Sequence, residues 1–362
     1  MPRWKLFAGL LPILILTAPN ALGDGTIPGA RLTSARAAGM ADAFLPLADD
    51  AGTALFYNPA GLGQIRGTHF EPGNIQMQAN DDFLNGFDTN YYKVTSLSNY
   101  APVIKQHPGI FPGVSTALFP NFSSRGFAMG VLYSARVSAQ SDGTTVHYRS
   151  HYQLIPTAGI GARFFSGRLR LGYSFQWVNQ ASGDVVESAS TTPMGYNQFL
   201  HQGSALSHNL GASLNLPMQY LPSFNVVARN VLGANYGTYS VVNLTKNPSS
   251  APADEPMTVD ASFSLQPKIV KGSNLNIVFE ERDVMNKTGL SLLERATVGL
   301  ELNIRSIFFL RGGYGSSYPA AGFGVRTARA EFGFSWFSEE LGTPTLRVRD
   351  VRYVLQYQIR AF

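Results

Sequence analysis

The chain has 362 residues, of which 14% are charged and 12% are aromatic, with 36 glycines and no cysteine. About a quarter of the residues of an average soluble protein are charged, so this chain is poor in charge. The lack of cysteine excludes disulfides and a lipid attached to an N-terminal cysteine. The formal net charge of +5 falls to +3 without Arg3 and Lys5, which is too small and too scattered to indicate nucleic-acid binding.

Residues 1–23 read as a secretory signal peptide. Two basic residues precede an apolar run over residues 6–18, and residues 21–23 form a small-x-small cleavage site. The alternative is a transmembrane helix, but a run of about a dozen apolar residues that includes Pro12 is shorter than the roughly 20 that span a bilayer. We therefore predict export and cleavage before Asp24, which fits a bacterial envelope protein.

A compact block follows at residues 49–63, which read DDAGTALFYNPAGLG and do not resemble a strand. Pro59 restricts its own φ and biases Asn58 toward extended geometry, whereas Gly61 permits conformations that other residues avoid. The chain can therefore reverse direction here. We interpret the block as a plug for a sheet that the later segments form.

Downstream, apolar and polar residues alternate with the period of a β-strand. In residues 293–305, every second side chain from Ala296 to Ile304 is apolar, and the residues between them are polar or glycine. The same alternation occurs in residues 168–177, 258–265 and 329–336. A soluble sandwich and a membrane barrel share this pattern, so the number and the ends of the strands must distinguish them.

Fourteen strands are expected. They are centred on residues 68–79, 110–119, 126–137, 145–165, 168–182, 204–216, 223–235, 256–267, 273–282, 294–305, 306–315, 318–327, 329–337 and 350–362. Bacterial outer-membrane barrels have an even number of strands, short turns at one end and longer external loops at the other. Here short links follow even strands and long links follow odd ones, which favours a barrel with both termini in the periplasm. Twelve strands is the alternative count.

The ends of the strands also favour a membrane barrel. Aromatic residues there fit the girdles that mark the lipid interfaces of such barrels. The candidates are Tyr133, Tyr173, Trp177, Tyr314, Trp336, Tyr353 and Tyr357. The last residue, Phe362, matches the terminal aromatic that is the usual assembly signature of the class. It shares the parity of the polar Gln356 and Gln358, so we expect either a bulge near Arg360 or a degenerate signal.

Residues 34–65, SARAAGMADAFLPLADDAGTALFYNPAGLGQI, resemble the hatch of the FadL family of outer-membrane transporters for long-chain fatty acids and hydrocarbons. The acidic pair Asp49-Asp50 and the turn at residues 58–60 match the family pattern, and fourteen strands is also the size of the FadL barrel. The resemblance implies an all-β fold: a 14-stranded antiparallel transmembrane β-barrel at residues 67–362, with an N-terminal hatch or plug at residues 24–66.

The same motif occurs in PorV-type proteins of a Bacteroidetes secretion system, which do not transport lipids. Arg229-Asn230 and residues 311–314 are at least as similar to that branch. The alternative function is therefore a PorV-like, non-transporting barrel that acts in secretion or envelope assembly.

The FadL resemblance also implies roles for individual residues. In that family the hatch shifts and opens a path through an apolar pocket to a lateral gap in the wall. Carried over, Phe44, Leu45, Leu47, Phe56 and Tyr57 would lie beside the pocket, and displacement of Asn58, Pro59 and Ala60 would gate it. The alternative is that this block only packs the barrel and starts its folding.

Residues 91–106 are expected to form an external loop with a short helix interrupted at Pro102. Its irregular apolar face would either collect hydrophobic ligands or fold over the mouth of the barrel. Contiguous exposed apolar surface would favour the first possibility.

Catalysis and metal binding are not indicated. His147 and His151 on a strand would lie about 13 Å apart, too far to share a metal that binds each ligand at roughly 2 Å. Neighbouring Ser-His pairs point to opposite faces of their strands, and no acidic partner is implied. Lumen-facing glycines such as Gly159 and Gly161 are expected to relieve crowding rather than bind phosphate.

The sequence therefore predicts a channel in the outer membrane of a Gram-negative bacterium, through which hydrophobic compounds such as long-chain fatty acids diffuse passively. Passive diffusion requires no cofactor, and we expect no metal and no enzymatic activity. The expected partners are outer-membrane lipids, a hydrophobic ligand and the barrel-assembly machinery during biogenesis, with no nucleic acid. We expect a monomer.

Overall fold

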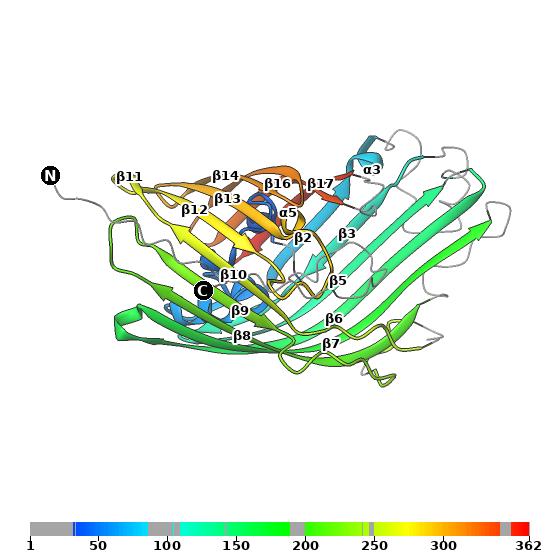
Figure 1. Ribbon diagram of the computed structural model, residues 1–362, viewed down its shortest axis with the longest axis horizontal. Helices are drawn as coiled ribbons and strands as arrows, with labels where there is room; N and C mark the ends of the chain where they lie inside the picture. Colours follow the sequence, from blue (N-terminus) through cyan, green and yellow to red (C-terminus); the bar gives the residue numbers. More distant parts are fainter. Residues whose placement is uncertain are drawn as a thin grey trace.

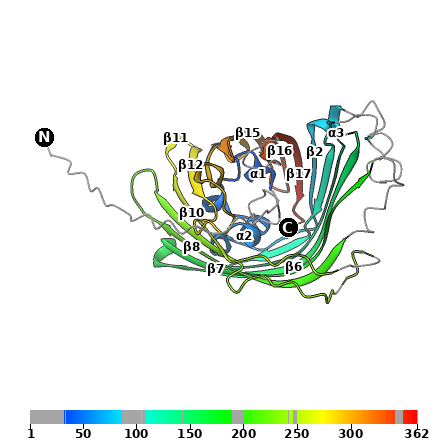
Figure 2. The same cartoon turned by 45° about the vertical axis from the view of Figure 1, so that its right-hand side comes forward.

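The computed structural model describes residues 32, 34–85, 104, 109–141, 143–188, 200–240, 242–245, 250–340 and 349–361. The predicted signal peptide, Phe362 and all of residues 91–106 except Ile104 lie outside this part of the chain. The strands form one antiparallel sheet that closes on itself, because the first long strand, β2, pairs with the last, β17 (Figures 1 and 2). The predicted β-barrel is therefore confirmed.

The sheet contains seventeen strand segments, and three prolines divide what would otherwise be fourteen strands. Pro72 separates β1 from β2, Pro120 lies between β3 and β4, and Pro267 lies between β10 and β11. Proline interrupts a ladder because it has no N–H to donate. Joining these pairs gives the fourteen strands that the sequence predicts.

The first seven of those strands contain β1 to β9. Their bounds are β1 His69–Glu71, β2 Gly73–Asn80, β3 Gly113–Leu118, β4 Asn121–Ser124, β5 Phe127–Ser141, β6 Thr145–Phe164, β7 Leu169–Ser188, β8 His201–Asn215 and β9 Ser223–Arg229. The other seven contain β10 Thr258–Leu265, β11 Lys268–Val270, β12 Ser273–Glu281, β13 Ala296–Ile304, β14 Phe308–Gly315, β15 Tyr318–Arg326, β16 Ala330–Glu340 and β17 Arg349–Ile359.

The links after even strands are short, as predicted, but the rule that odd strands end in long loops fails twice. Strand β5 ends at Ser141 and β6 begins at Thr145, while only Ser316 and Ser317 join β14 to β15. Both of these serines have positive φ, 50° and 70°. Such a two-residue turn matches the twist of the flanking strands. The predicted strand bounds 306–315 and 318–327 imply this tight link, although the rule of long loops after odd strands does not.

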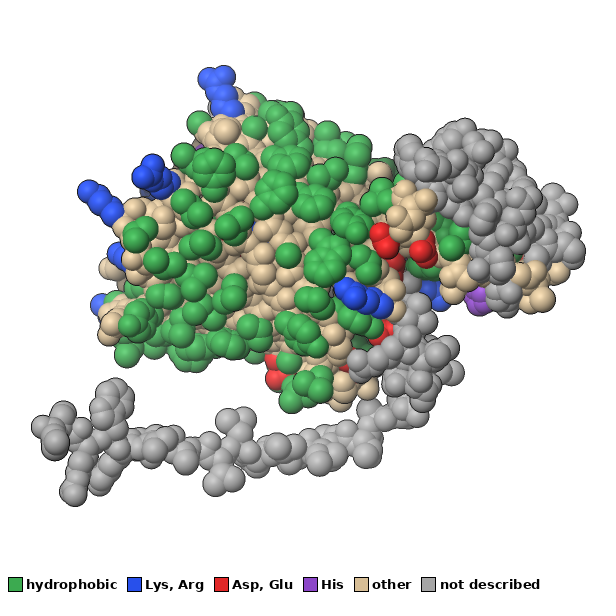
Figure 3. Space-filling view, turned by 90° about the horizontal axis from the view of Figure 1, so that it is seen from above, with side chains coloured by type: hydrophobic (Ala, Val, Ile, Leu, Met, Phe, Trp, Pro, Cys, Tyr) green, Lys and Arg blue, Asp and Glu red, His purple; other side chains and the backbone are tan. Residues whose placement is uncertain are grey.

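The two faces of the wall differ in the way the alternation predicts. On β13, Leu300 is 44% exposed on the outer face, whereas its neighbour Glu301 is completely buried inside. Apolar side chains cover the outer surface (Figure 3), and inward positions carry mainly polar residues. This arrangement fits an outer-membrane β-barrel. Among the described residues, no helix is long and apolar enough to cross a membrane.

The structure also contains short helices. Inside the curve of the sheet lie α1 Ala35–Ala38, η1 Leu45–Leu47, α2 Ala51–Phe56 and η2 Pro59–Gln64 (Figure 2). Elsewhere, α3 Asp81–Asn85 follows β2, η5 Phe165–Gly167 joins β6 to β7, and α5 Leu292–Arg295 precedes β13.

Candidate functional site

The candidate site consists of residues 34–65, here called the N-terminal segment, and the strands around it. Its helical turns begin at side chains that cap them. The Asp50 carboxylate accepts a hydrogen bond from Thr53 N at 2.8 Å at the start of α2. Asn58 Oδ1 accepts from Ala60 N at 3.0 Å at the start of η2, whose first residue is Pro59. Local sequence therefore determines where the segment turns.

The η2 turn rests on a row of three wall glycines, here called the glycine seat. Gly161, Gly172 and Gly211 are direct cross-strand partners on β6, β7 and β8. A Cβ atom on Gly172 would lie 2.0 Å from the Pro59 carbonyl oxygen, and one on Gly211 would lie 2.4 Å from Asn58 Oδ1. Real Cβ atoms do not approach other atoms this closely. Only glycine at these positions lets the turn touch the wall.

Asn58 joins three parts of the site. Its side chain is buried, and Nδ2 donates to the Leu45 carbonyl oxygen at 2.9 Å and to Ser213 Oγ on β8 at 3.2 Å. The amide therefore connects η2 to η1 and to the wall, in addition to capping its own turn.

The other residues singled out from the sequence lie close together. Phe44, Leu45, Phe56 and Tyr57 are each at most 2% exposed. The rings of Phe44 and Tyr57 meet edge to face, with centroids 5.4 Å apart. Leu47 is only partly buried and packs at the margin of the same cluster.

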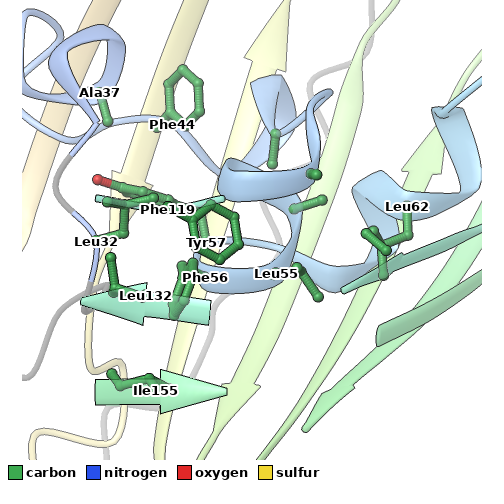
Figure 4. Packing of buried hydrophobic residues seen from close by; sticks show 14 of the residues in the cluster. Leu32, Ala37, Phe44, Leu55, Phe56, Tyr57, Leu62, Phe119, Leu132 and Ile155 are labelled. Carbon is green, nitrogen blue, oxygen red and sulfur yellow. The ribbon is translucent and has the colours of Figure 1, made fainter. Parts of the chain in front are cut away.

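An apolar layer lies on the long-loop side of α2. Phe56 packs edge to face on Phe119 of the wall, with centroids 5.3 Å apart, beside Leu132 and Ile155 (Figure 4). The layer is completed by Val178, Ala205, Ala234 and Tyr236. All of its members are at most 8% exposed.

Polar groups border this layer along the lumen. Toward the long loops, Gln153 Nε2 donates to Gln180 Oε1 at 3.0 Å. Toward the short turns, Ser174 and Gln176 both donate to the Leu55 carbonyl oxygen at 3.1 Å. Along β6 and β7, the apolar layer therefore lies between two sets of polar side chains.

A buried ion cluster holds the other half of the segment. Glu301 on β13 accepts from Arg36 Nε at 2.8 Å and from Arg311 Nε at 2.9 Å, and Arg36 also pairs with Asp49 at 2.7 Å. Arg311 Nη2 has no hydrogen-bond partner in the described part of the chain and lines a small polar cavity with Arg36 and Gln356. The buried Glu301 carboxylate therefore joins Arg36 of α1 to Arg311 of the wall.

Two further wall residues bind backbone atoms of the segment. Arg229 pairs with Asp260 at 2.6 Å and donates to the carbonyl oxygens of Phe56 at 2.7 Å and Tyr57 at 3.0 Å. The Glu280 carboxylate accepts from Phe44 N at 2.8 Å and from Leu45 N, the next residue, at 3.0 Å.

The sequence pattern does not predict that Arg229, Glu280, Glu301 and Arg311 contact the N-terminal segment. Glu301 was identified only as part of the polar face of its strand. The available signal is the presence of charges at inward strand positions in a chain with few charges, because a buried charge requires a partner. Which partner it has depends on strand register, which the sequence pattern does not provide.

Asp50 has a perturbed acidity. Burial, with the nearby carboxylates of Asp49 and Glu71 as smaller causes, raises the pKa of Asp50 from 3.8 to about 6. A raised pKa means that protonation favours the packed state. The resulting stabilisation is complete below the unfolded pKa of 3.8 and is lost as the pH rises through about 6.

We therefore expect the α2 amides to exchange hydrogen more readily, relative to intrinsic rates, as the pH rises from 4 to 7. The Asp50→Asn variant keeps an acceptor for Thr53 N and should show a flatter profile. Hydrogen exchange followed by mass spectrometry checks this. Identical pH profiles for the two proteins would contradict it.

Three further predictions from the sequence concern metal binding, the lumen-facing glycines and the external loop. No group of three His, Asp or Glu side chains that could hold a metal occurs among the described residues. Gly159 and Gly161 contact Leu62 of the segment, so they relieve crowding as predicted. Ile104, the described residue of the external loop, is fully buried beside Val146 and Tyr148.

Two solved structures that share the fold of this chain are monoaromatic hydrocarbon channels. A TodX monoaromatic hydrocarbon channel carrying the deltaS2 mutation matches with a TM-score of 0.51 and 10% identity, over 86% of this chain and 94% of that one. The CymD monoaromatic hydrocarbon channel matches with a TM-score of 0.50 and 12% identity, over 92% and 98%. A Pseudomonas aeruginosa FadL homologue has a TM-score of 0.49 and 11% identity, over 91% and 99%.

No protein-family model matches the chain, and no curated protein matches it significantly. The likeness therefore concerns the fold, and the neighbours that share it are channels rather than enzymes. The FadL-like barrel indicated by the sequence is confirmed in its fold, which this chain shares with the TodX and CymD hydrocarbon channels.

Proposed function

We propose that this chain is an outer-membrane channel for passive uptake of hydrophobic compounds such as long-chain fatty acids, and that the N-terminal segment gates it as a hatch. The observation that carries the proposal is the apolar layer, in which Phe56 of the segment packs on the wall residues Phe119, Leu132 and Ile155. A buried apolar layer is where a hydrophobic ligand would gain most by leaving water.

The contacts of the segment support gating. Its η2 turn touches the glycine seat closely, while Asn58, Arg36 and Glu301 hold it through hydrogen bonds and ion pairs. Polar contacts of this kind are directional and can be exchanged for water when the segment moves. We propose that Asn58, Pro59 and Ala60 move off the seat, which would separate Phe56 from the wall and admit the ligand.

The first test alters the apolar layer alone. Val178→Thr preserves shape but adds a hydroxyl, which costs about 1–3 kcal/mol in an apolar site. We expect uptake of radiolabelled oleate into proteoliposomes to need roughly tenfold more ligand, because each 1.4 kcal/mol is a factor of ten. The matched control is Val131→Thr, whose side chain is 40% exposed on the outer face.

Equal oleate uptake by Val178→Thr and Val131→Thr would contradict a path through the apolar layer. Transport of glucose at the same rate as oleate would contradict a hydrophobic channel. Stable co-purification with envelope proteins, together with no uptake, would instead favour the PorV-like function.

The second test locks the segment. A Cβ atom on Gly333 would lie 3.3 Å from Ala35 Cβ, near the range for a disulfide. The chain has no cysteine of its own, so Ala35→Cys with Gly333→Cys introduces a single possible disulfide.

We expect oxidation of this double variant to abolish oleate uptake and reduction to restore it, because α1 can no longer leave β16. The two single-cysteine variants are the controls and should not respond to oxidant. Uptake that continues in the fully oxidised double variant would show that α1 need not move.

A further inference from the structure

The short-turn end of the barrel carries a ring of exposed basic residues. Successive hairpins of an antiparallel barrel place all turns after even strands at one end, together with the chain that enters β1. The ring consists of Arg66, Arg125, Arg163, Arg168, Lys268, Lys271, Arg305 and Arg329, all exposed. In the described part of the chain, none of these eight forms an ion pair.

Carboxylates near this end already have partners. Glu71 and Glu331 are only 4% and 11% exposed at their side chains, and they pair with Arg360 at 2.8 Å and Arg326 at 2.6 Å. In the N-terminal segment, Asp49 pairs with Arg36 and Asp50 caps α2. The positive charge of the ring is therefore not compensated by these groups.

The two ends of the molecule differ in charge. Most of the Lys and Arg side chains visible in Figure 3 lie at its left-hand end, where the short turns are, and the Asp and Glu side chains lie toward the other end. The exposed Asp184 and Asp254, in or after strands that lead to long loops, belong to that other end.

Exposed apolar side chains alternate with the ring. Lys268 and Lys271 flank Ile269 and Val270, which are 55% and 64% exposed, and Arg305 lies two residues from Ile307. Even when fully extended, two residues span at most about 7 Å. The cations therefore lie next to the edge of the lipid-facing surface, within the screening length of about 10 Å that applies at 0.1 M salt.

We infer that this ring binds phosphate-bearing, anionic lipid headgroups in the membrane leaflet at the short-turn end. Basic residues interleaved with exposed apolar ones are typical of surfaces that contact anionic membranes. An acidic soluble protein would be attracted to the charges, but it would not cover the apolar side chains that continue into the lipid-facing band. Phosphate groups would supply the counter-charge that the described carboxylates near this end do not provide.

The test uses the full chain in nanodiscs and a fluorophore on a single introduced cysteine. Ser166→Cys places the label within the ring, and Gly289→Cys places it at the long-loop end. We measure energy transfer to trace amounts of headgroup-labelled phosphatidylglycerol or phosphatidylcholine. Phosphatidylglycerol should give several-fold more transfer at Ser166→Cys, and the excess should vanish in 0.5 M salt because salt screens exposed charges. The Gly289→Cys label should show no preference.

Substitution of ring cations should reduce the preference. Lys271→Gln is compared with Lys287→Gln, which removes an exposed lysine at the other end. Only Lys271→Gln should lower the excess, and a variant with Arg163, Arg168, Lys268, Lys271 and Arg305 all changed to Gln should abolish it. If that variant fails to fold, the comparison of Lys271→Gln with Lys287→Gln still tests the inference.

Three results would overturn the inference. The two lipids could give equal transfer with the unmodified ring, the excess from phosphatidylglycerol could persist at high salt, or the two lysine variants could show the same excess. Binding of an acidic soluble protein without any lipid preference would do the same. The result is independent of oleate uptake, so either proposal can fail alone.

Discussion

Gly172→Ala is expected to displace the η2 turn from the glycine seat and to open the channel. The added Cβ would overlap the Pro59 carbonyl oxygen at 2.0 Å and Ala60 N at 2.5 Å, and neither backbone atom can rotate away. Overpacking of this kind costs about 1–3 kcal/mol or more. We expect a lower free energy of unfolding from detergent micelles and faster hydrogen exchange across residues 58–64.

If the segment is the gate, the same variant should also take up oleate faster than the native protein. The matched control is Gly312→Ala on β14, where a Cβ would meet no atom within 4 Å. That variant should keep native stability and uptake. Loss of stability without faster uptake would indicate that the segment packs the barrel without gating it, and equal behaviour of the two variants would contradict the seat itself.

Glu301→Gln is expected to release α1 from the wall. The variant removes the negative charge between Arg36 and Arg311, while Glu301 itself is completely buried. Removing one partner of a buried ion pair costs about 3–5 kcal/mol, because the remaining charge is left without compensation. We expect the free energy of unfolding to fall by that amount and proteases to cleave the segment near residues 34–45.

Two comparisons isolate the ion cluster. Glu281→Gln breaks a pair with Arg295 at 2.9 Å, but Glu281 is 36% exposed at its side chain, so the loss should be below about 1 kcal/mol. Adding Arg311→Gln to Glu301→Gln should restore part of the stability, because the second charge is removed as well. Equal losses for Glu281→Gln and Glu301→Gln would contradict the assigned role of the cluster.

Much of the wall could be predicted because its signals are local. Alternation in residues 293–305 identified the outward Leu300 and the inward Glu301, and the ends of the fourteen strands follow from similar patterns and from turn residues. The two-residue link at Ser316-Ser317 follows from the predicted strand bounds 306–315 and 318–327, but it breaks the rule of long loops after odd strands, because parity alone does not determine loop length. Serine rarely adopts the positive φ that this turn uses.

The candidate site could be predicted only in part. The motif from Phe44 to Ala60 identified the residues that lie in the lumen, because Pro59 restricts the backbone of the turn wherever it is placed. The residues that hold it, Glu301 and Arg229, gave no comparable signal. Glu301 contacts Arg36, which is 265 residues away in the chain, and Arg229 contacts Phe56, which is 173 residues away.

The sequence by itself determined the strands, their inward and outward faces and the short capped turns of the N-terminal segment, because side-chain period and backbone restriction act within a few residues. Only the tertiary structure decided which residues of the N-terminal segment contact which residues of the wall. Closure and register aligned Gly161, Gly172 and Gly211 into one seat and brought Glu301 between Arg36 and Arg311. Contacts of this kind depend on the pairing of many strands at once, and no local pattern contains that information.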